Sequence, residues 1–173
     1  ERLLYAAPLI KAVAMALRTT PALNGTFMDG THHKSTAIHM GIATALRGGG
    51  LVAPALHDTA ERSIDDVMES LRDIVSRVRV GRIRSSEMSD ATVTVSILGE
   101  DTADTVLPVI YPPQVAIIGC GAVRERPWII DGAVVPRRVM TIAVAGDHRV
   151  SDGRVAARFL SRLAEIFKEP EQL

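Results

Sequence analysis

A stretch of nineteen residues without a charged side chain, residues 105–123, constrains the fold of this chain more than any other feature. Its length approaches the roughly 20 apolar residues that a membrane-spanning helix needs. It nevertheless contains Pro108, Pro112, Pro113, Gly119 and Gly121, which a simple spanning helix would not favour. We therefore interpret residues 105–123 as buried strand and turn, and expect no membrane partner.

Size and charge limit the function classes. The chain has 173 residues, of which 47% are apolar, and its 20 basic residues balance its 20 acidic ones. A chain of this size buries roughly two-thirds of its unfolded surface, which is enough for a core. The neutral balance argues against a nucleic-acid partner, whose binding site would be basic. The single cysteine, Cys120, cannot form an internal disulfide, so we expect a reducing compartment. Seventeen of the 20 basic residues are arginine, a composition that suggests a GC-rich bacterial genome, so the expected compartment is the bacterial cytoplasm.

The periodicity predicts three helices. One runs over residues 8–17 with Pro8 in its first turn, where a missing N–H costs little. A second begins after Ser63 as the N-cap and carries an apolar stripe to Val78. A third begins near Asp152.

Between these helices, runs rich in β-branched residues predict strands at residues 37–46, 50–56, 92–98, 114–118, 128–130, 133–135 and 139–144. The order is helix, strands, helix, strands, helix. The predicted fold class is therefore α+β, with a mixed β-sheet covered by helices.

Four of the five histidines carry no clear chemical signal. His32 and His33 lie in a stretch expected to be a polar loop, and one interpretation pairs them with His39 at a metal ion. Adjacent histidines point poorly at one ion, and no carboxylate or thiol cluster accompanies them, so we expect no metal. His57 is interpreted as a surface or turn residue.

His148 stands apart because it follows an apolar strand and precedes a helix. Scaffolds often hold catalytic groups in loops at strand ends. A purely structural interpretation is equally open: residues 146–153 make a polar turn in which Asp152 caps the helix and Gly153 is a turn residue.

The string from His148 to Gly153 matches His-x-x-x-Asp-Gly, the motif of coenzyme A-dependent acyltransferases of the chloramphenicol acetyltransferase type. The longer string 147–160 resembles the dihydrolipoamide acyltransferase component of 2-oxo acid dehydrogenase complexes. Further segments resemble that family in the family's order: residues 21–24, 50–54, 92–99 and 112–117.

This resemblance implies a chloramphenicol acetyltransferase-like fold and acyl transfer between the thiols of dihydrolipoamide and coenzyme A. The acyl group would be acetyl or branched-chain. A thiol with a pKa near 8.5 needs a base at neutral pH, and His148 is the implied general base. Ser96 would donate a hydrogen bond to the oxyanion, and Asp152 would orient the histidine loop. The lipoyl group would arrive on a separate domain.

The resemblance also implies partners. Family members form homotrimers with the histidine and the serine of one site on different subunits, and trimers build cubic or dodecahedral cores. Lipoyl domains, the dehydrogenase and dihydrolipoamide dehydrogenase would then be partners. We expect residues 1–173 to be an acyltransferase catalytic domain without its N-terminal part, lipoyl domain and subunit-binding domain. The arginine that pairs with Asp152 in the family would lie in that N-terminal part.

Some positions depart from the family pattern. Residues 47–50 form an apparently longer loop, in which Arg47 is either a contact for a coenzyme A phosphate or a solvated loop residue. Residues 100–104 are unusually acidic, and Ile97 and Tyr111 replace residues common in relatives. These changes leave the acyl specificity open. Two alternative functions also remain open: a free-standing coenzyme A-dependent acyltransferase acting on a small hydroxyl or amine, and an inactive assembly scaffold.

Overall fold

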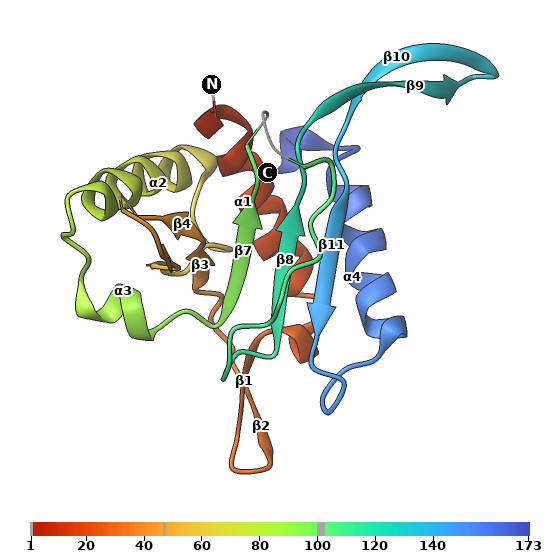
Figure 1. Cartoon of the computed structure of the whole chain (residues 1–173). Coiled ribbons are helices and arrows are strands. Elements are labelled where there is room, and N and C mark those ends of the chain that lie inside the picture. Colours follow the sequence, from red (N-terminus) through yellow and green to blue (C-terminus); the bar gives the residue numbers. More distant parts are fainter. Residues whose placement is uncertain (1, 47, 100–102) are drawn as a thin grey trace.

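The centre of the molecule is a mixed β-sheet of five strands in the order β11-β8-β7-β3-β6 (Figure 1). The computed structural model describes residues 2–46, 48–99 and 103–173. The strands of the sheet are β3 (Met40–Ile42), β6 (Ala55–Leu56), β7 (Val93–Ile97), β8 (Ala116–Cys120) and β11 (Ile142–Gly146). Strand β7 runs parallel to β3 and β8, whereas β6 and β11 run antiparallel to their neighbours. The predicted α+β class with a mixed sheet is confirmed.

Helices cover one face of this sheet. Helix α1 (Arg2–Leu17) packs against α2 (Ile64–Arg79) and α4 (Gly153–Ile166), and α4 also contacts β11. In Figure 1, α1 and α4 lie behind the sheet, and α2 lies on the side of β3 and β6 together with the short α3 (Ser85–Ser89). The core is made by the buried faces of these helices and strands, including Ile10, Leu17, Met40, Val67, Leu71, Val95, Ile118, Phe159 and Leu163. Short 3-10 turns occur at Pro21–Leu23 and Pro170–Gln172.

The first helix is longer than the sequence predicts. It begins at Arg2, so Pro8 lies inside the helix and not in its first turn. A proline there removes one backbone hydrogen bond. The residues just before it, Ala6 and Ala7, are buried, so packing against the core outweighs that loss. Lys11, the charge within this apolar helix, reaches the carbonyl oxygens of Ala60 and Arg62 at 2.8 and 2.5 Å.

Within the part of the chain that the structure describes, three hairpins lie outside the central sheet. Strands β1 (Gly25–Met28) and β2 (Thr31–Lys34) pair across a tight turn, so the expectation of a polar loop at His32 and His33 is wrong. The polar pattern of these residues is that of an exposed strand. Strands β4 (Thr44–Ala45) and β5 (Leu51–Val52) form a second hairpin, which divides the strands predicted at 37–46 and 50–56.

The third hairpin, β9 (Arg124–Ile130) and β10 (Ala133–Val139), projects from the body (Figure 1). Its strands are longer than predicted. The strand predicted at 139–144 is divided between the end of β10 and the start of β11.

The uncharged stretch is only partly buried. Residues from Gln114 to Ala122 are buried, whereas Leu107 and Val109 are 83% and 85% exposed. Residues 104–108 lie directly on β8, because a Cβ atom on Gly119 would come within 2.7 Å of Val106 and one on Gly121 would overlap the Asp104 carbonyl. Within the described residues, no helix is long and apolar enough to cross a membrane.

Candidate active site

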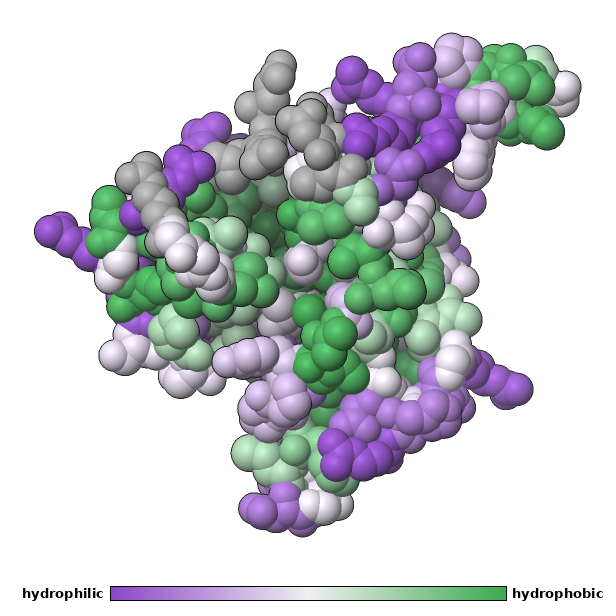
Figure 2. Space-filling model, viewed as in Figure 1, coloured by the Kyte–Doolittle hydropathy of each residue, from purple (hydrophilic) through white to green (hydrophobic). Residues whose placement is uncertain are grey.

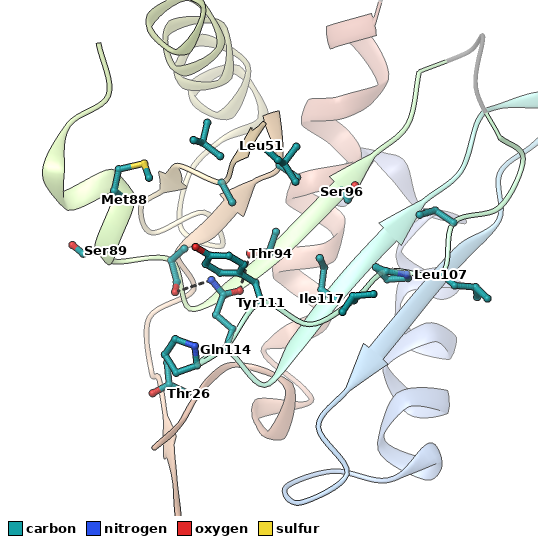
Figure 3. A pocket seen from close by; sticks show the side chains of 18 residues that line it. Thr26, Leu51, Met88, Ser89, Thr94, Ser96, Leu107, Tyr111, Gln114 and Ile117 are labelled. Carbon is teal, nitrogen blue, oxygen red and sulfur yellow. Dashed lines mark hydrogen bonds between the residues drawn. The ribbon is translucent and has the colours of Figure 1, made fainter. Parts of the chain in front are cut away.

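A cavity of about 430 Å³ opens on the sheet face opposite α1 and α4 (Figure 3). Ser96, near the end of β7, points into it. The remaining lining is mostly apolar and comes from β5, α3 and the segment before β8, including Leu51, Met88, Val106, Leu107 and Tyr111. Among the described residues, none of the side chains that line the cavity is charged, and the Ser96 hydroxyl has no hydrogen-bond partner. The hydroxyl is therefore free to donate to a bound molecule.

Polar side chains beside Ser96 are held by one another. Thr94, two residues before Ser96 on the same face of β7, donates from Oγ1 to Gln114 Oε1 at 2.7 Å. Gln114 in turn donates from Nε2 to the Ala91 carbonyl at 3.3 Å. Both side chains are buried. These bonds fix one wall of the cavity without using the Ser96 hydroxyl.

An ion pair attaches α3 at the rim of the cavity. The buried Glu87 carboxylate accepts two hydrogen bonds from Arg77 of α2, at 2.6 and 2.7 Å, and one from the Arg84 backbone N–H at 3.0 Å. These bonds lower the pKa of Glu87, the Arg77 contribution being the largest. Met88 and Ser89, the next two residues, line the cavity. Helix α3 was not predicted from the sequence, since five residues are too few for a periodic signal.

His148 lies on the tight turn between β11 and α4, and its side chain is exposed. The turn is closed by backbone hydrogen bonds from Val150 and Ser151 to the Asp147 carbonyl, both at 3.0 Å. Arg149 donates to the Asp147 carboxylate from its guanidinium group and from its backbone N–H. These bonds hold the pKa of Asp147 at about 2, so this carboxylate is ionised at neutral pH.

Asp152 caps α4. Its Oδ1 accepts a hydrogen bond from the Val155 backbone N–H at 2.9 Å. Among the described residues, no arginine pairs with it. The structural interpretation of Asp152 as N-cap is therefore confirmed, and its expected effect on the histidine loop would act through the first turn of this helix.

Ser96 and His148 lie at opposite ends of the sheet. Ser96 pairs with Gly119 of β8, whereas Gly146, the last residue of β11, pairs with Ala116. With about 3.3 Å per residue along a strand and about 4.8 Å between strands, Ser96 is roughly 14 Å from Gly146. The chain then runs further away to reach His148. One chain therefore cannot bring both side chains to the same reacting carbon.

The histidines considered for a metal site are not brought together. His39 Nδ1 accepts from the Asp58 backbone N–H, and its ring contacts that of His57 edge to face. His57 Nε2 lies 3.0 Å from an Asp90 carboxylate oxygen. His32 lies instead on the β1–β2 hairpin. The described residues contain no group of three or more side chains placed to hold a metal ion.

Arg47 and Cys120 do not contribute to the described site. Arg47, the candidate for a coenzyme A phosphate, lies outside the described residues. Cys120 is buried in β8, and burial raises the pKa of its thiol to about 12. Cys120 therefore stays protonated and inaccessible, and is not a competing nucleophile.

Comparison with known proteins places this fold in a class. The structure is similar to a chloramphenicol acetyltransferase structure with a TM-score of 0.62 at 15% identity, covering 93% of this chain and 76% of that one. This likeness shows the chloramphenicol acetyltransferase-like fold. Residues 1–173 match the family model described as 2-oxoacid dehydrogenases acyltransferase (catalytic domain). The chain belongs to this family.

Relatives agree with that assignment. The dihydrolipoyllysine-residue acetyltransferase component of the pyruvate dehydrogenase complex of Zymomonas mobilis is 33% identical over 162 residues, which are 94% of this chain. This chain spans only 37% of the length of that relative. A probable dihydrolipoamide acetyltransferase from Listeria monocytogenes superposes with a TM-score of 0.90 at 30% identity, covering 96% of this chain and 70% of that one.

A third solved structure bears on catalysis. It is described as a crystallographic and enzymatic investigation of a serine, a histidine and an asparagine in the catalytic mechanism of Azotobacter vinelandii dihydrolipoamide acetyltransferase. It has a TM-score of 0.86 at 27% identity, and covers 93% of this chain and 67% of that one.

Proposed function

We propose that this chain is the catalytic domain of a dihydrolipoamide acyltransferase that transfers an acetyl or branched-chain acyl group between dihydrolipoamide and coenzyme A. The observation that carries the proposal is the Ser96 hydroxyl, which has no partner in the described structure and points into an uncharged cavity large enough for a thioester. Family membership supplies the reaction class.

The chemistry assigns a step to each side chain. His148 accepts the proton of the attacking thiol, and the resulting thiolate forms a bond to the thioester carbonyl carbon. The carbonyl electron pair moves onto oxygen, and Ser96 donates a hydrogen bond to this oxyanion. When the oxyanion collapses, the carbon–sulfur bond to the leaving thiol breaks, and His148 returns the proton to the leaving sulfur.

The spacing of these residues supports their roles. The serine and histidine investigated in the Azotobacter vinelandii enzyme are separated by the same number of positions as Ser96 and His148. The asparagine follows that histidine at the interval at which Asp152 follows His148. Asp152 thus stands where that enzyme has an amide, which favours an orienting role over a proton-accepting one.

The site needs a second copy of the chain. Because Ser96 and His148 lie at opposite ends of one sheet, the histidine must come from a neighbouring subunit, as in a trimer. Exposed apolar residues offer surfaces for such a neighbour: Leu107 and Val109 lie beside the cavity, and Ile129 and Val134 lie on the β9–β10 hairpin. Figure 2 shows apolar side chains on this face and near the end of the hairpin. Pro113 and Gln114, from the Pro-Pro-Gln segment that resembles the family, line the same cavity.

The test measures acyl transfer to dihydrolipoamide from acetyl-, isobutyryl-, isovaleryl- and succinyl-coenzyme A, with the full protein and its His148→Ala and Ser96→Ala variants. We expect activity with an uncharged acyl group, and at least a hundredfold lower turnover in His148→Ala with unchanged assembly. Mixing the two inactive variants should restore part of the activity, because mixed trimers contain sites with both residues intact.

Three results would contradict the proposal. An equally active His148→Ala variant would exclude the base. Failure of mixed trimers to recover activity, after subunit exchange is verified, would exclude a shared site. An assembled wild-type protein without activity toward any of the four donors would favour a scaffold or another acyl acceptor.

A further inference from the structure

The turn that carries His148 is attached to the β1–β2 hairpin as well as to the central sheet. The guanidinium carbon of Arg149 lies 3.9 Å from the ring centroid of Phe27 on β1. The Phe27 backbone N–H donates to the Pro113 carbonyl, and the Asp147 backbone N–H donates to the Val115 carbonyl, both at 2.8 Å. The hairpin and the turn are therefore held on the same segment, residues 113–115.

Both sequence neighbours of His148 are fixed to each other. Arg149 donates from Nε to Asp147 Oδ1 at 3.0 Å and from a terminal nitrogen to Oδ2 at 2.6 Å. The Arg149 backbone N–H also donates to Oδ1 at 3.0 Å. A guanidinium group that donates to both oxygens of a carboxylate forms a directional, bidentate contact. The contact with the Phe27 ring restricts the orientation of the guanidinium plane. His148 thus lies between two residues whose side chains are joined to each other, and the guanidinium of one of them also contacts the Phe27 ring.

The second strand of the hairpin also faces this turn. His32 pairs directly with Phe27 across the hairpin, so the two side chains lie on the same face. His32 Nε2 is buried and has no hydrogen-bond partner among the described residues. Burial, followed by the charges of Lys34 and His33, lowers the pKa of His32, and the charge of Asp147 opposes this shift.

We propose that Phe27 and Arg149 are positioning residues for His148: the ring holds the guanidinium, the guanidinium holds Asp147, and the imidazole between them is aimed toward the neighbouring subunit. The inference rests on the proposed role of His148 as the base. Misplacing a catalytic group by about 1 Å can lower the rate by about a hundredfold. Loosening one contact of a turn that keeps its backbone hydrogen bonds should cost less, about five- to twentyfold in kcat.

The experiment compares Phe27→Leu and Arg149→Met with wild type in the full protein, with kcat and both KM values measured by acyl transfer. Hydrogen–deuterium exchange of residues 147–151 provides a second readout, which is independent of activity. Phe27→Tyr keeps the ring face, and Arg149→Lys keeps the charge without the fork. Phe167→Leu is the matched control, since it makes the same change in a half-exposed phenylalanine at the far end of α4.

We expect kcat to fall five- to twentyfold in Phe27→Leu and Arg149→Met, with KM within twofold of wild type and exchange at residues 147–151 at least threefold faster. Phe27→Tyr should retain at least half of the wild-type kcat, Arg149→Lys should recover only part of it, and Phe167→Leu should match wild type. A merely structural role would lower the melting temperature and leave kcat per folded site unchanged.

The inference and the proposed function fail in different ways. If wild type is active and depends on His148, an unchanged kcat in both variants overturns the positioning role. If wild type shows no acyl transfer, the proposed function fails, and unchanged exchange at residues 147–151 then refutes the attachment of the turn to Phe27 as well.

Discussion

Removing Arg77 while leaving Glu87 in place tests how α3 is held at the rim of the cavity. In Arg77→Met, the Glu87 carboxylate loses both guanidinium hydrogen bonds and keeps only the one from the Arg84 backbone. The Glu87 side chain is 6% exposed and that of Arg77 is 18% exposed, so water replaces little of what is lost. Breaking a buried ion pair from one side costs about 3–5 kcal/mol. Because Arg77 is partly exposed, we expect the lower end, about 3 kcal/mol.

The assay is thermal unfolding followed by circular dichroism at fixed protein concentration. For a chain of this length, about 3 kcal/mol corresponds to a melting temperature lower by about 6–12 °C at pH 7. The control is Arg162→Met, which removes an exposed ion pair with Glu165 at 3.2 Å. Such surface pairs contribute about 1 kcal/mol or less.

The pH dependence provides an independent check. The pKa of Glu87 in the folded protein lies below its ordinary value of 4.5, so the ion pair stabilises the fold above that pH and is lost as the pH falls. In Arg77→Met the Glu87 carboxylate keeps one charged partner, the exposed Arg84 guanidinium, 3.9 Å away, so protonating Glu87 relieves the cost of burying its charge. The difference between wild type and Arg77→Met should therefore be largest at neutral pH and should narrow below about pH 4.5.

A double variant separates the cost of the buried Glu87 charge from the loss of side-chain packing. Arg77→Met combined with Glu87→Leu should recover more than half of the loss, because apolar replacements of buried ion pairs are often neutral. A loss below 1 kcal/mol in Arg77→Met, or a loss that does not depend on pH, would refute the reasoning.

Three further changes probe the site itself. Ser96→Ala should lower kcat by about a hundredfold or more with little change in KM, as expected for a bond that tightens in the transition state; an effect on KM alone would reassign Ser96 to binding. Asp152→Ala should destabilise the protein by about 1 kcal/mol because the cap of Val155 N–H is lost, whereas Asp152→Asn keeps an acceptor; equal losses in thermal unfolding would exclude capping. Gly121→Ala would overlap the Asp104 carbonyl and displace the segment that lines the cavity, so we expect about 1–3 kcal/mol lower stability and a higher KM; unchanged values of both would contradict this.

N-caps and apolar stripes in the sequence correctly predicted the helices that these short-range interactions stabilise. The second helix has an N-cap at Ser63, and its apolar stripe supplies the buried residues Val67, Leu71, Ile74 and Val78. The cap of α4 by Asp152 follows from the same chemistry. The start of the first helix was predicted wrongly, because Pro8 resembles a helix start signal. The helix continues across Pro8 because its residues pack against the core. Short strands at β4 and β5 give too little pattern to separate them from β3 and β6.

The sequence alone, through motif resemblance and strand patterning, determined the α+β class, the family and the identities of Ser96, His148 and Asp152 as candidates. These depend on residue types and spacings, which are written in the chain. Only the tertiary structure decided that Ser96 opens into a cavity while His148 lies at the other end of the sheet, and that Phe27 touches the histidine turn. Strand order and direction bring distant segments together or hold them apart, and no local pattern contains that information.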